Sequence, residues 1–408
     1  MFGDAHGRLR LGRPAATPAF ALRERTDSPS LGEEEMFGDA HGPQRLDRTA
    51  ATPASQPGPR IRWPGRAAPA LVLLPAVLLL AVACGGDDDG EGGEPSADAP
   101  QTVRLQLDWT PNTNHIGIYV ALANGWYEEA GIDLEILPYG DTNPDTIVAN
   151  GRADVAISFP PNVIFSRAAG LELTSIAAVL QSNPTELTVL ADSDIQSPKD
   201  FDGKTYAGFG LPYEAPQIRT VVIADGGTGD FEVATLDTFA YEALYNERAD
   251  FTEMFMTWEG IEAGLRDIEI RSFKYSDYGV PDFPGVVLVA RTEDVENGSA
   301  KLTKFLEVTR RGYEFAAEEP EEASQVFLDH LPDAFPDPEL VRRSTEALQT
   351  YFVVDGRPWG EQSADDWKAY AHWFIEQDIV LDDNDNEIES EGDLPGGPLY
   401  SNDLLPDE

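Results

Sequence analysis

The stretch from Asp108 to His115 concentrates side chains that can recognise a small ligand. It reads Asp-Trp-Thr-Pro-Asn-Thr-Asn-His. Trp109 offers a flat apolar face for an aromatic ring. The amides of Asn112 and Asn114 both donate and accept hydrogen bonds, which suits ring nitrogens and exocyclic amines, and His115 is a further bonding group. With Asp108 as an acceptor, these residue types indicate a site for a nitrogen heterocycle.

Three of these residues also have a purely structural interpretation. Trp109 could belong to the apolar core, Asn114 could cap the helix that follows, and His115 could bond locally at the start of that helix. The position of the stretch favours a site, because it lies between a strand-like run, Val103–Leu107, and an apolar helical run, 116–130. In open α/β sheets, ligands bind beyond the carboxyl ends of the strands.

Polar and aromatic residues also follow other predicted strands. They are Ser158 and Asn162 after a third strand, Phe209, Tyr213 and Glu214 after the first strand of a second set, and Trp258 and Glu259 after a later strand. A carboxylate suits a ligand whose amino groups donate hydrogen bonds, although Glu214 could instead complement the dipole of its own helix. An anion such as sulfonate or nitrate would favour lysine or arginine in its site. None of these loops contains either residue. The loops therefore predict a neutral or cationic heterocycle.

From residue 101 onward, strand-like runs alternate with helical ones. This rhythm predicts a largely parallel sheet with helices on both faces, followed by a second set of strands and then helices. The apolar run Val286–Ala290 could return the chain to the first set. The predicted fold class is α/β, with lobe one at 101–190 and 290–408 and lobe two at 191–289. A central cleft at the hinge between two lobes is a preferred place for a small molecule.

The chain before residue 101 is expected to contain three further segments. Residues 1–59 contain a repeated MFGDAHG motif and little hydrophobic periodicity, which indicates a disordered extension or upstream sequence translated from a wrongly placed start. Residues 60–84 have basic residues, then an uncharged apolar run, and end at Cys84. This pattern resembles a bacterial lipoprotein signal with Cys84 as the lipidated residue; the alternative is an uncut signal anchor. Residues 85–100 are acidic and predict a flexible tether.

The formal net charge of −44 argues against nucleic acid as a partner, because binding to the phosphate backbone needs lysine and arginine. An excess of carboxylates with few lysines suggests adaptation to salt, which screens the repulsion. Cys84 is the only cysteine, which excludes a disulfide framework and a thiolate metal cluster within the chain.

The motif at 108–121 resembles the N-terminal signature of bacterial receptors for thiamine pyrimidine precursors. The resemblance continues at Gly125–Ile132, Gly151–Ala156, Trp258–Ala263 and Leu399–Pro406. These receptors are solute-binding proteins of ABC importers. They are related to the yeast thiamine pyrimidine synthase and, more distantly, to receptors for sulfonates, nitrate and riboflavin. The resemblance implies a periplasmic-binding-protein-like fold of type II and an ABC permease as partner.

The related synthase is an enzyme, and this chain departs from it at two places. There, the strand end that corresponds to 158–162 supplies a lysine that holds pyridoxal phosphate and a histidine that is consumed. Here Ser158 and Asn162 stand at those places, and without a lysine amine no Schiff base forms. A single cysteine also cannot build the synthase's cysteine-rich iron site. These departures predict a protein that is not an enzyme and has no cofactor or metal.

We therefore expect a monomeric, lipid-anchored, extracytoplasmic receptor that closes its hinge around an aminopyrimidine and delivers it to an ABC permease. Trp109 and an aromatic residue of lobe two would sandwich the ring. Glu214 and Glu259 would accept from its amines, and Asn112 and Ser158 would orient it. The alternatives are a receptor for riboflavin or for another small molecule of the sulfonate or nitrate type, a pyrimidine-forming enzyme, and a purely structural surface lipoprotein.

Overall fold

The computed structural model describes residues 100–406, apart from positions 355, 382–387, 389, 391, 393 and 395. The expected segments 1–59 and 60–84 and the tether up to residue 99 lie outside the described residues, and so does Cys84. Within the described part, no helix has the length and apolar character needed to cross a membrane.

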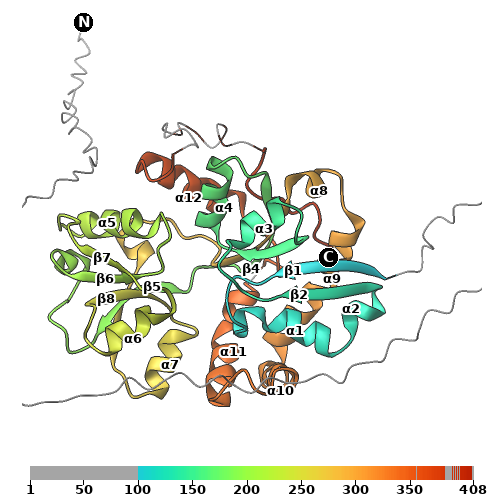
Figure 1. Ribbon diagram of the computed structural model, residues 1–408, viewed down its shortest axis with the longest axis horizontal. Coiled ribbons are helices and arrows are strands. Elements are labelled where there is room, and N and C mark those ends of the chain that lie inside the picture. The colour runs from blue at the N-terminus through green and yellow to red at the C-terminus, as the bar shows by residue number, and fades with distance from the viewer. Residues whose placement is uncertain are drawn as a thin grey trace, which may run out of the picture. The chain divides into compact units, whose positions relative to one another are not determined.

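Two five-stranded sheets form the centres of two lobes (Figure 1). The sheet of lobe one has the strand order β2-β1-β3-β10-β4. Its strands are β1 (Gln101–Gln106), β2 (Ile132–Leu137), β3 (Val155–Ser158), β4 (Leu173–Leu180) and β10 (Val286–Arg291). β1 runs parallel to β2 and β3, whereas β10 runs antiparallel to both β3 and β4. Strands β3 and β4 are buried along their whole length, as their apolar runs predict.

The sheet of lobe two has the order β7-β6-β8-β5-β9. Its strands are β5 (Thr185–Leu190), β6 (Thr205–Gly208), β7 (Glu232–Thr235), β8 (Phe251–Phe255) and β9 (Ile270–Lys274). β6 is parallel to β7 and β8, and β5 is antiparallel to β8 and β9. The predicted parallel pairing is therefore confirmed for part of each sheet, while β5 and β10, which follow the two crossings between lobes, run antiparallel.

Helices cover both faces of each sheet (Figure 1). Those of lobe one are α1 (Ile116–Ala123), α2 (Trp126–Glu129), α3 (Pro144–Ala149), α4 (Pro160–Ala168), α8 (Thr292–Glu296), α9 (Ala300–Glu318), α10 (Pro320–His330), α11 (Pro338–Phe352) and α12 (Ala364–Glu376). Those of lobe two are α5 (Glu214–Ala224), α6 (Ala240–Tyr245) and α7 (Glu259–Leu265). Short 3-10 turns are η1 (Thr113–His115), η2 (Pro198–Phe201), η3 (Asp237–Phe239) and η4 (Tyr275–Tyr278). The single helix predicted over 116–130 is two helices, because Gly125 between them has a φ of 73°, which helical residues do not adopt.

The described chain passes between the lobes through two segments. The first, 181–184, leads from β4 to β5, and the second, 279–285, leads to β10. The sheets place β5 in lobe two, so the change of lobe falls before Thr185 rather than at the expected residue 190. The expected return of Val286–Ala290 to the first sheet is confirmed by β10.

Candidate ligand-binding site

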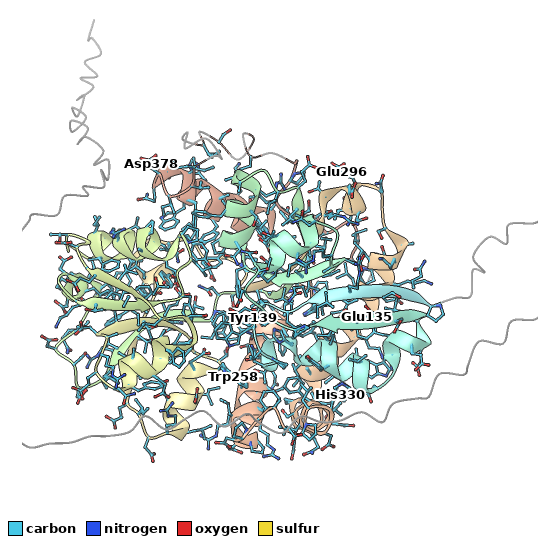
Figure 2. All side chains as sticks on the ribbon, viewed as in Figure 1. Glu135, Tyr139, Trp258, Glu296, His330 and Asp378 are labelled. Carbon is cyan, nitrogen blue, oxygen red and sulfur yellow. The ribbon has the colours of Figure 1, made fainter. Side chains whose placement is uncertain are left out.

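A cavity of about 320 Å³ lies between the two lobes. Lobe one contributes residues that follow β1, β2 and β3, and lobe two contributes the loop after β6, strand β8 and the start of α7. Tyr139 and Trp258 lie where the lobes face each other (Figure 2). The volume falls within the range of small-molecule pockets, and the wall includes the ends of β1, β3, β6 and β8, at which the sequence predicted a site.

Ten of the twelve predicted site residues line this cavity. They are Asp108, Trp109, Asn112, Asn114, Asn162, Phe209, Tyr213, Glu214, Trp258 and Glu259. His115 and Ser158 do not line it, and both are buried, with 0% and 1% of their surface exposed. Ser158 is the last residue of β3, in contact with neighbouring strands. Its predicted role as a direct ligand contact is therefore not supported by its position.

His115 forms a hydrogen bond with Asp108 and does not itself line the cavity. Its Nδ1 accepts a hydrogen bond from the backbone N–H of Asn112 at 3.3 Å, and its Nε2 lies 2.8 Å from Oδ1 of Asp108. Because Nδ1 is an acceptor, Nε2 carries the proton and donates it to the carboxylate. Oδ2 of Asp108 has no hydrogen-bond partner among the described residues. The histidine thus orients a carboxylate whose second oxygen is available to a ligand.

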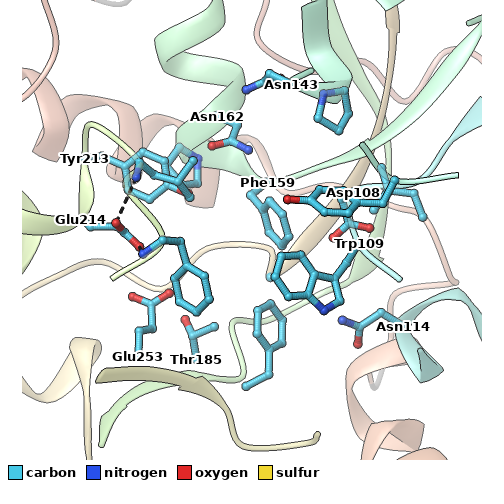
Figure 3. Close-up of a pocket in the computed structure, with 18 of the residues that line it drawn as sticks. Asp108, Trp109, Asn114, Asn143, Phe159, Asn162, Thr185, Tyr213, Glu214 and Glu253 are labelled. Atoms are coloured by element: carbon cyan, nitrogen blue, oxygen red, sulfur yellow. Dashed lines mark hydrogen bonds between the residues drawn. The ribbon is translucent and has the colours of Figure 1, made fainter. Parts of the chain in front are cut away.

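The two asparagines of the first loop have different roles. Oδ1 of Asn112 accepts from the backbone N–H of Asn114 at 2.9 Å, and its Nδ2 donates to the carbonyl of Thr110 at 3.3 Å. Asn112 is therefore the cap of η1, the role that the sequence left open for Asn114. The side chain of Asn114 lies beside Trp109 at the cavity (Figure 3) and has no hydrogen bond within the described residues. Asn114 is the asparagine of this loop that is free to bind.

Glu214 organises the loop that precedes its own helix. Its carboxylate accepts from the backbone N–H groups of Phe209, Gly210 and Leu211 at 3.0, 2.9 and 3.0 Å. The hydroxyl of Tyr206 adds a fourth contact at 3.4 Å. Burial raises the pKa of Glu214 although the backbone donors oppose that rise. A carboxylate accepts about four hydrogen bonds, so Glu214 positions the loop and has little capacity left for a ligand.

Aromatic side chains from the two lobes meet across the cavity. Trp109 lies 6.3 Å from Phe209 at an interplanar angle of 82°, and Phe159 lies 6.1 Å from Phe255 at 60°. Such edge-to-face pairs are attractive. The predicted sandwich was between Trp109 and an aromatic residue of lobe two. If that residue is Phe209, one ring has to turn, because the two contact each other edge to face.

Two further carboxylates face the cavity from lobe two. Glu259 accepts from the backbone N–H of Phe255 at 3.2 Å, and burial raises its pKa to about 8. Glu253 accepts from the hydroxyl of Tyr275, and burial raises its pKa to about 7. Glu253 was not among the residues predicted from the sequence. The signal was present, since Phe251, Glu253 and Phe255 share one face of β8 and a charged side chain between two rings is unusual there.

Other wall residues were also missed. They include Tyr139, Asn143, Phe159, Thr185, Gln217, Tyr241, Phe283 and Tyr370. Tyr139 and Asn143 follow the end of β2, so the rule that identified the first loop could have found them. Tyr370 belongs to α12, far along the chain, and its helical pattern gave no sign of a place in the cavity.

The lobes contact each other on both flanks of the cavity. On one flank, the Tyr370 hydroxyl donates to Oε1 of Gln217 at 3.2 Å. On the other, the Ser344 hydroxyl donates to the carbonyl of Thr257. At the hinge, a Cβ on Gly285 would lie 2.8 Å from the carbonyl oxygen of Ser182, so only glycine allows the two crossing segments to approach this closely.

The electrostatic character of the wall is acidic and aromatic. No lysine, arginine or histidine is among its residues in the described part of the chain. The same part contains no group of three or more histidine, cysteine, aspartate or glutamate residues arranged to hold a metal ion. The arrangement can thus stack a flat ring and accept hydrogen bonds from it, and it offers no cationic side chain to an anion.

Residues 112–323 match the family model described as "NMT1/THI5 like". The formylaminopyrimidine-binding protein of Halalkalibacterium halodurans is 32% identical over 298 residues, which cover 70% of this chain and 90% of that protein. A 4-amino-5-hydroxymethyl-2-methylpyrimidine phosphate synthase of Saccharomyces cerevisiae is 21% identical over 253 residues, or 56% of this chain and 71% of the synthase.

Among solved structures, the alkanesulfonate-binding protein of Xanthomonas axonopodis pv. citri superposes with a TM-score of 0.55 at 14% identity. The superposition covers 70% of this chain and 96% of that protein. At this identity the similarity shows the fold, which is that of the periplasmic binding proteins, and confirms the predicted two-lobe α/β architecture.

Proposed function

The chain belongs to the NMT1/THI5-like family, and from this premise we propose that it is an extracytoplasmic receptor that binds an aminopyrimidine and delivers it to an ABC permease. The observation that carries the proposal is the cavity between the lobes, whose wall combines aromatic rings with carboxylates and contains no lysine or arginine. The 32% identical relative is a formylaminopyrimidine-binding protein, which agrees with this wall.

The residues of the cavity wall also distinguish between the candidate ligands. A sulfonate or nitrate would enter beside Asp108, Glu253 and Glu259 with no cationic side chain to balance its charge. Riboflavin has three fused rings and a polyol chain, and a volume of about 320 Å³ is small for it. A single substituted pyrimidine ring fits both the volume and the charge.

The proposed binding mode assigns three kinds of contact. The indole of Trp109 provides a stacking face. Oδ2 of Asp108 and the carbonyl oxygen of the Glu259 carboxyl group accept hydrogen bonds from amino groups, and the Asn114 amide bonds to ring nitrogens. Asn162, which also lines the cavity, is a further candidate. Glu214 and Asn112 hold the loops, since their polar atoms are already engaged.

The alternative of a pyrimidine-forming enzyme has less support. Relatives in yeast are synthases, but the wall of this cavity contains no lysine that could hold pyridoxal phosphate. Ser158, at the place where the resemblance puts the lysine, is buried and outside the cavity. Cys84 is the only thiol in the chain. These residues do not fit the cofactor and iron site of a synthase, and we propose a binding protein that is not an enzyme.

Membrane attachment is a separate part of the proposal. We infer a lipid anchor on Cys84 from the apolar run and small residues that precede it, with 85–100 as a tether and the receptor acting as a monomer. Replacing Cys84 by serine should move the protein from the membrane fraction to the soluble fraction, and mass spectrometry of the wild-type N-terminal peptide should show acyl chains. An unmodified Cys84 in membrane-bound protein would contradict the anchor.

The function is tested by thermal-shift and calorimetric titration of the full-length chain at low and high salt. The ligands are aminopyrimidines, thiamine, riboflavin, taurine and nitrate. A ligand at about 100 times its dissociation constant stabilises a protein by about 2.7 kcal/mol, which raises Tm by a few degrees in a domain of this size. We expect stabilisation by aminopyrimidines alone. Stabilisation by riboflavin or an anion would overturn the proposed ligand, and no response to any of them would overturn the receptor.

A further inference from the structure

Glu253 lies on the lobe-two side of the cavity, on β8. Its neighbours in the wall are Thr185 and Glu214, while Asp108 and Trp109 lie on the opposite side (Figure 3). The cavity thus has a carboxylate at each end and rings between them. A flat ligand that spans it presents one edge to Asp108 and the other edge, or a substituent on it, to Glu253.

One carboxylate oxygen of Glu253 accepts a hydrogen bond, and the other has no hydrogen-bond partner among the described residues. The hydroxyl of Tyr275 donates to Oε2. Oε1 has no hydrogen-bond partner among the described residues, and the side chain is part of the cavity wall. A carboxylate oxygen in such surroundings needs a donor, and it faces the cavity that the proposed ligand would enter.

The surroundings of Glu253 supply no positive charge. The ionisable groups that act on it or are acted on by it are Tyr206, Tyr213, Glu214, Tyr241, Tyr275 and Tyr370. All of these are acids. Lys274, next to Tyr275 in the chain, has an exposed side chain and is not part of this wall; it lines an adjoining cavity that shares Thr185 with it. Burial and the nearby Glu214 raise the pKa of Glu253 to about 7, in agreement with the lack of a cationic neighbour.

We propose that Glu253 is a specificity-determining residue that selects a ligand carrying a protonated primary amine. This inference rests on the proposed function and names the class of aminopyrimidine. A cation placed against a half-buried carboxylate gains more than a neutral donor does, because hydrogen bonds between charged groups are the stronger ones. An alkylamine is protonated near neutral pH, as lysine is. The preferred ligand is therefore an aminopyrimidine with a side arm that ends in an amine, rather than in a hydroxyl or a formamide.

The test measures dissociation constants by calorimetry at pH 7.5 for three pyrimidines that differ only in the end of that arm: amine, hydroxyl and formamide. Wild-type protein should bind the amine at least about tenfold more tightly than either neutral ligand. Glu253→Gln, which is isosteric, should reduce that preference to about threefold or less while binding of the neutral ligands stays nearly constant.

Two control variants isolate the effect. Glu232→Gln removes one negative charge from an exposed position on β7, away from the cavity, and should retain the full preference. Tyr275→Phe removes the neutral donor but keeps the carboxylate, and should also retain it. If Glu253→Gln does not fold, the comparison of the three ligands on wild-type protein still tests the inference, because equal affinities would overturn it.

The outcomes distinguish this inference from the proposed function. A wild-type protein that binds the neutral pyrimidines as tightly as the amine overturns the inference and leaves the receptor standing. A preference that persists in Glu253→Gln also overturns it. If none of the three pyrimidines binds wild-type protein, the proposed function itself fails.

Discussion

His115 donates a hydrogen bond from Nε2 to Oδ1 of Asp108 over 2.8 Å, from a position with no exposed surface. The same ring accepts from the backbone of Asn112. The imidazole therefore fixes both the carboxylate at the cavity and the first turn of η1. A histidine in a binding motif is here a positioning residue for its neighbour.

Replacing His115 by alanine should affect stability and binding together. The variant loses two buried hydrogen bonds and leaves a cavity, so the free energy of unfolding should fall by about 2 kcal/mol or more. Release of Asp108 should weaken aminopyrimidine binding by about tenfold. Urea denaturation and calorimetry measure the two effects. His372→Ala changes an exposed histidine on α12 and should alter neither; unchanged binding in His115→Ala would contradict the positioning role.

Replacing Trp109 by alanine should weaken aminopyrimidine binding by about 10- to 100-fold, because the ligand loses an aromatic face and the apolar contact area that comes with it. The matched control is Trp126→Ala. Trp126 packs against Phe315 and Arg311 outside the cavity, so this variant should lose stability and keep its affinity. Equal losses of affinity in both variants would show that the effect of Trp109 is structural.

The stability of the protein should depend on the ionisation of Glu259. Its pKa is raised from 4.5 to about 8 by burial, so between these values the folded state holds a proton that the unfolded state has lost. The contribution of this residue to the unfolding free energy is therefore present below about pH 4.5 and declines as pH rises to about 8. Glu259→Gln removes this decline.

The measurement is the difference in unfolding free energy between Glu259→Gln and wild type at several pH values. Relative to wild type, the unfolding free energy of Glu259→Gln should increase by up to about 3 kcal/mol between pH 5 and 8. Glu232→Gln, at an exposed site, should show a difference that is nearly constant over that range. A constant difference for Glu259→Gln would mean that its carboxylate is ionised normally.

The C-terminal segment depends on a buried guanidinium. Arg167 has no exposed surface and donates to the carbonyls of Leu173, Gly397 and Pro398. Arg167→Lys cannot reproduce these donors, so the free energy of unfolding should fall by about 2 kcal/mol or more. The segment near Gly397 should also become a site of limited proteolysis. Arg342→Lys, at an exposed position on α11, is the control and should behave as wild type does.

Much of the architecture could be predicted from the sequence because strands and helices differ in hydrophobic period. The strand-like run Val103–Leu107 and the apolar run Val286–Ala290 correspond closely to β1 and β10. The break at Gly125 was missed, since apolar residues continue on both sides of it and only the backbone angle reveals the turn. The assignment of β5 to lobe two was missed as well, because strand pairing with β8 and β9 is a long-range contact that local periodicity does not encode.

For the site, the sequence predicted the loops that form it but not the state of each side chain. The rule about strand ends located the loops that contain Asp108 and Trp258, and both line the cavity. It could not say which polar atoms remain free. Glu214 looked like a ligand acceptor until the three backbone donors on its carboxylate were seen. Tyr370 comes from α12, which begins more than eighty residues after the end of η4 in lobe two, and only the tertiary fold brings it to the cavity.

The position of β10 has a consequence for how the protein is made. β10 lies between β3 and β4 in the first sheet, yet all of lobe two separates it from them along the chain. The strands of lobe two, in contrast, are contiguous in sequence from β5 to β9. During synthesis, all five strands of lobe two emerge before β10, whereas the facing edges of β3 and β4 in lobe one stay unpaired until residue 291 arrives. A chain released before that residue would expose those edges to other chains, which makes this interval the one in which the protein most needs a chaperone.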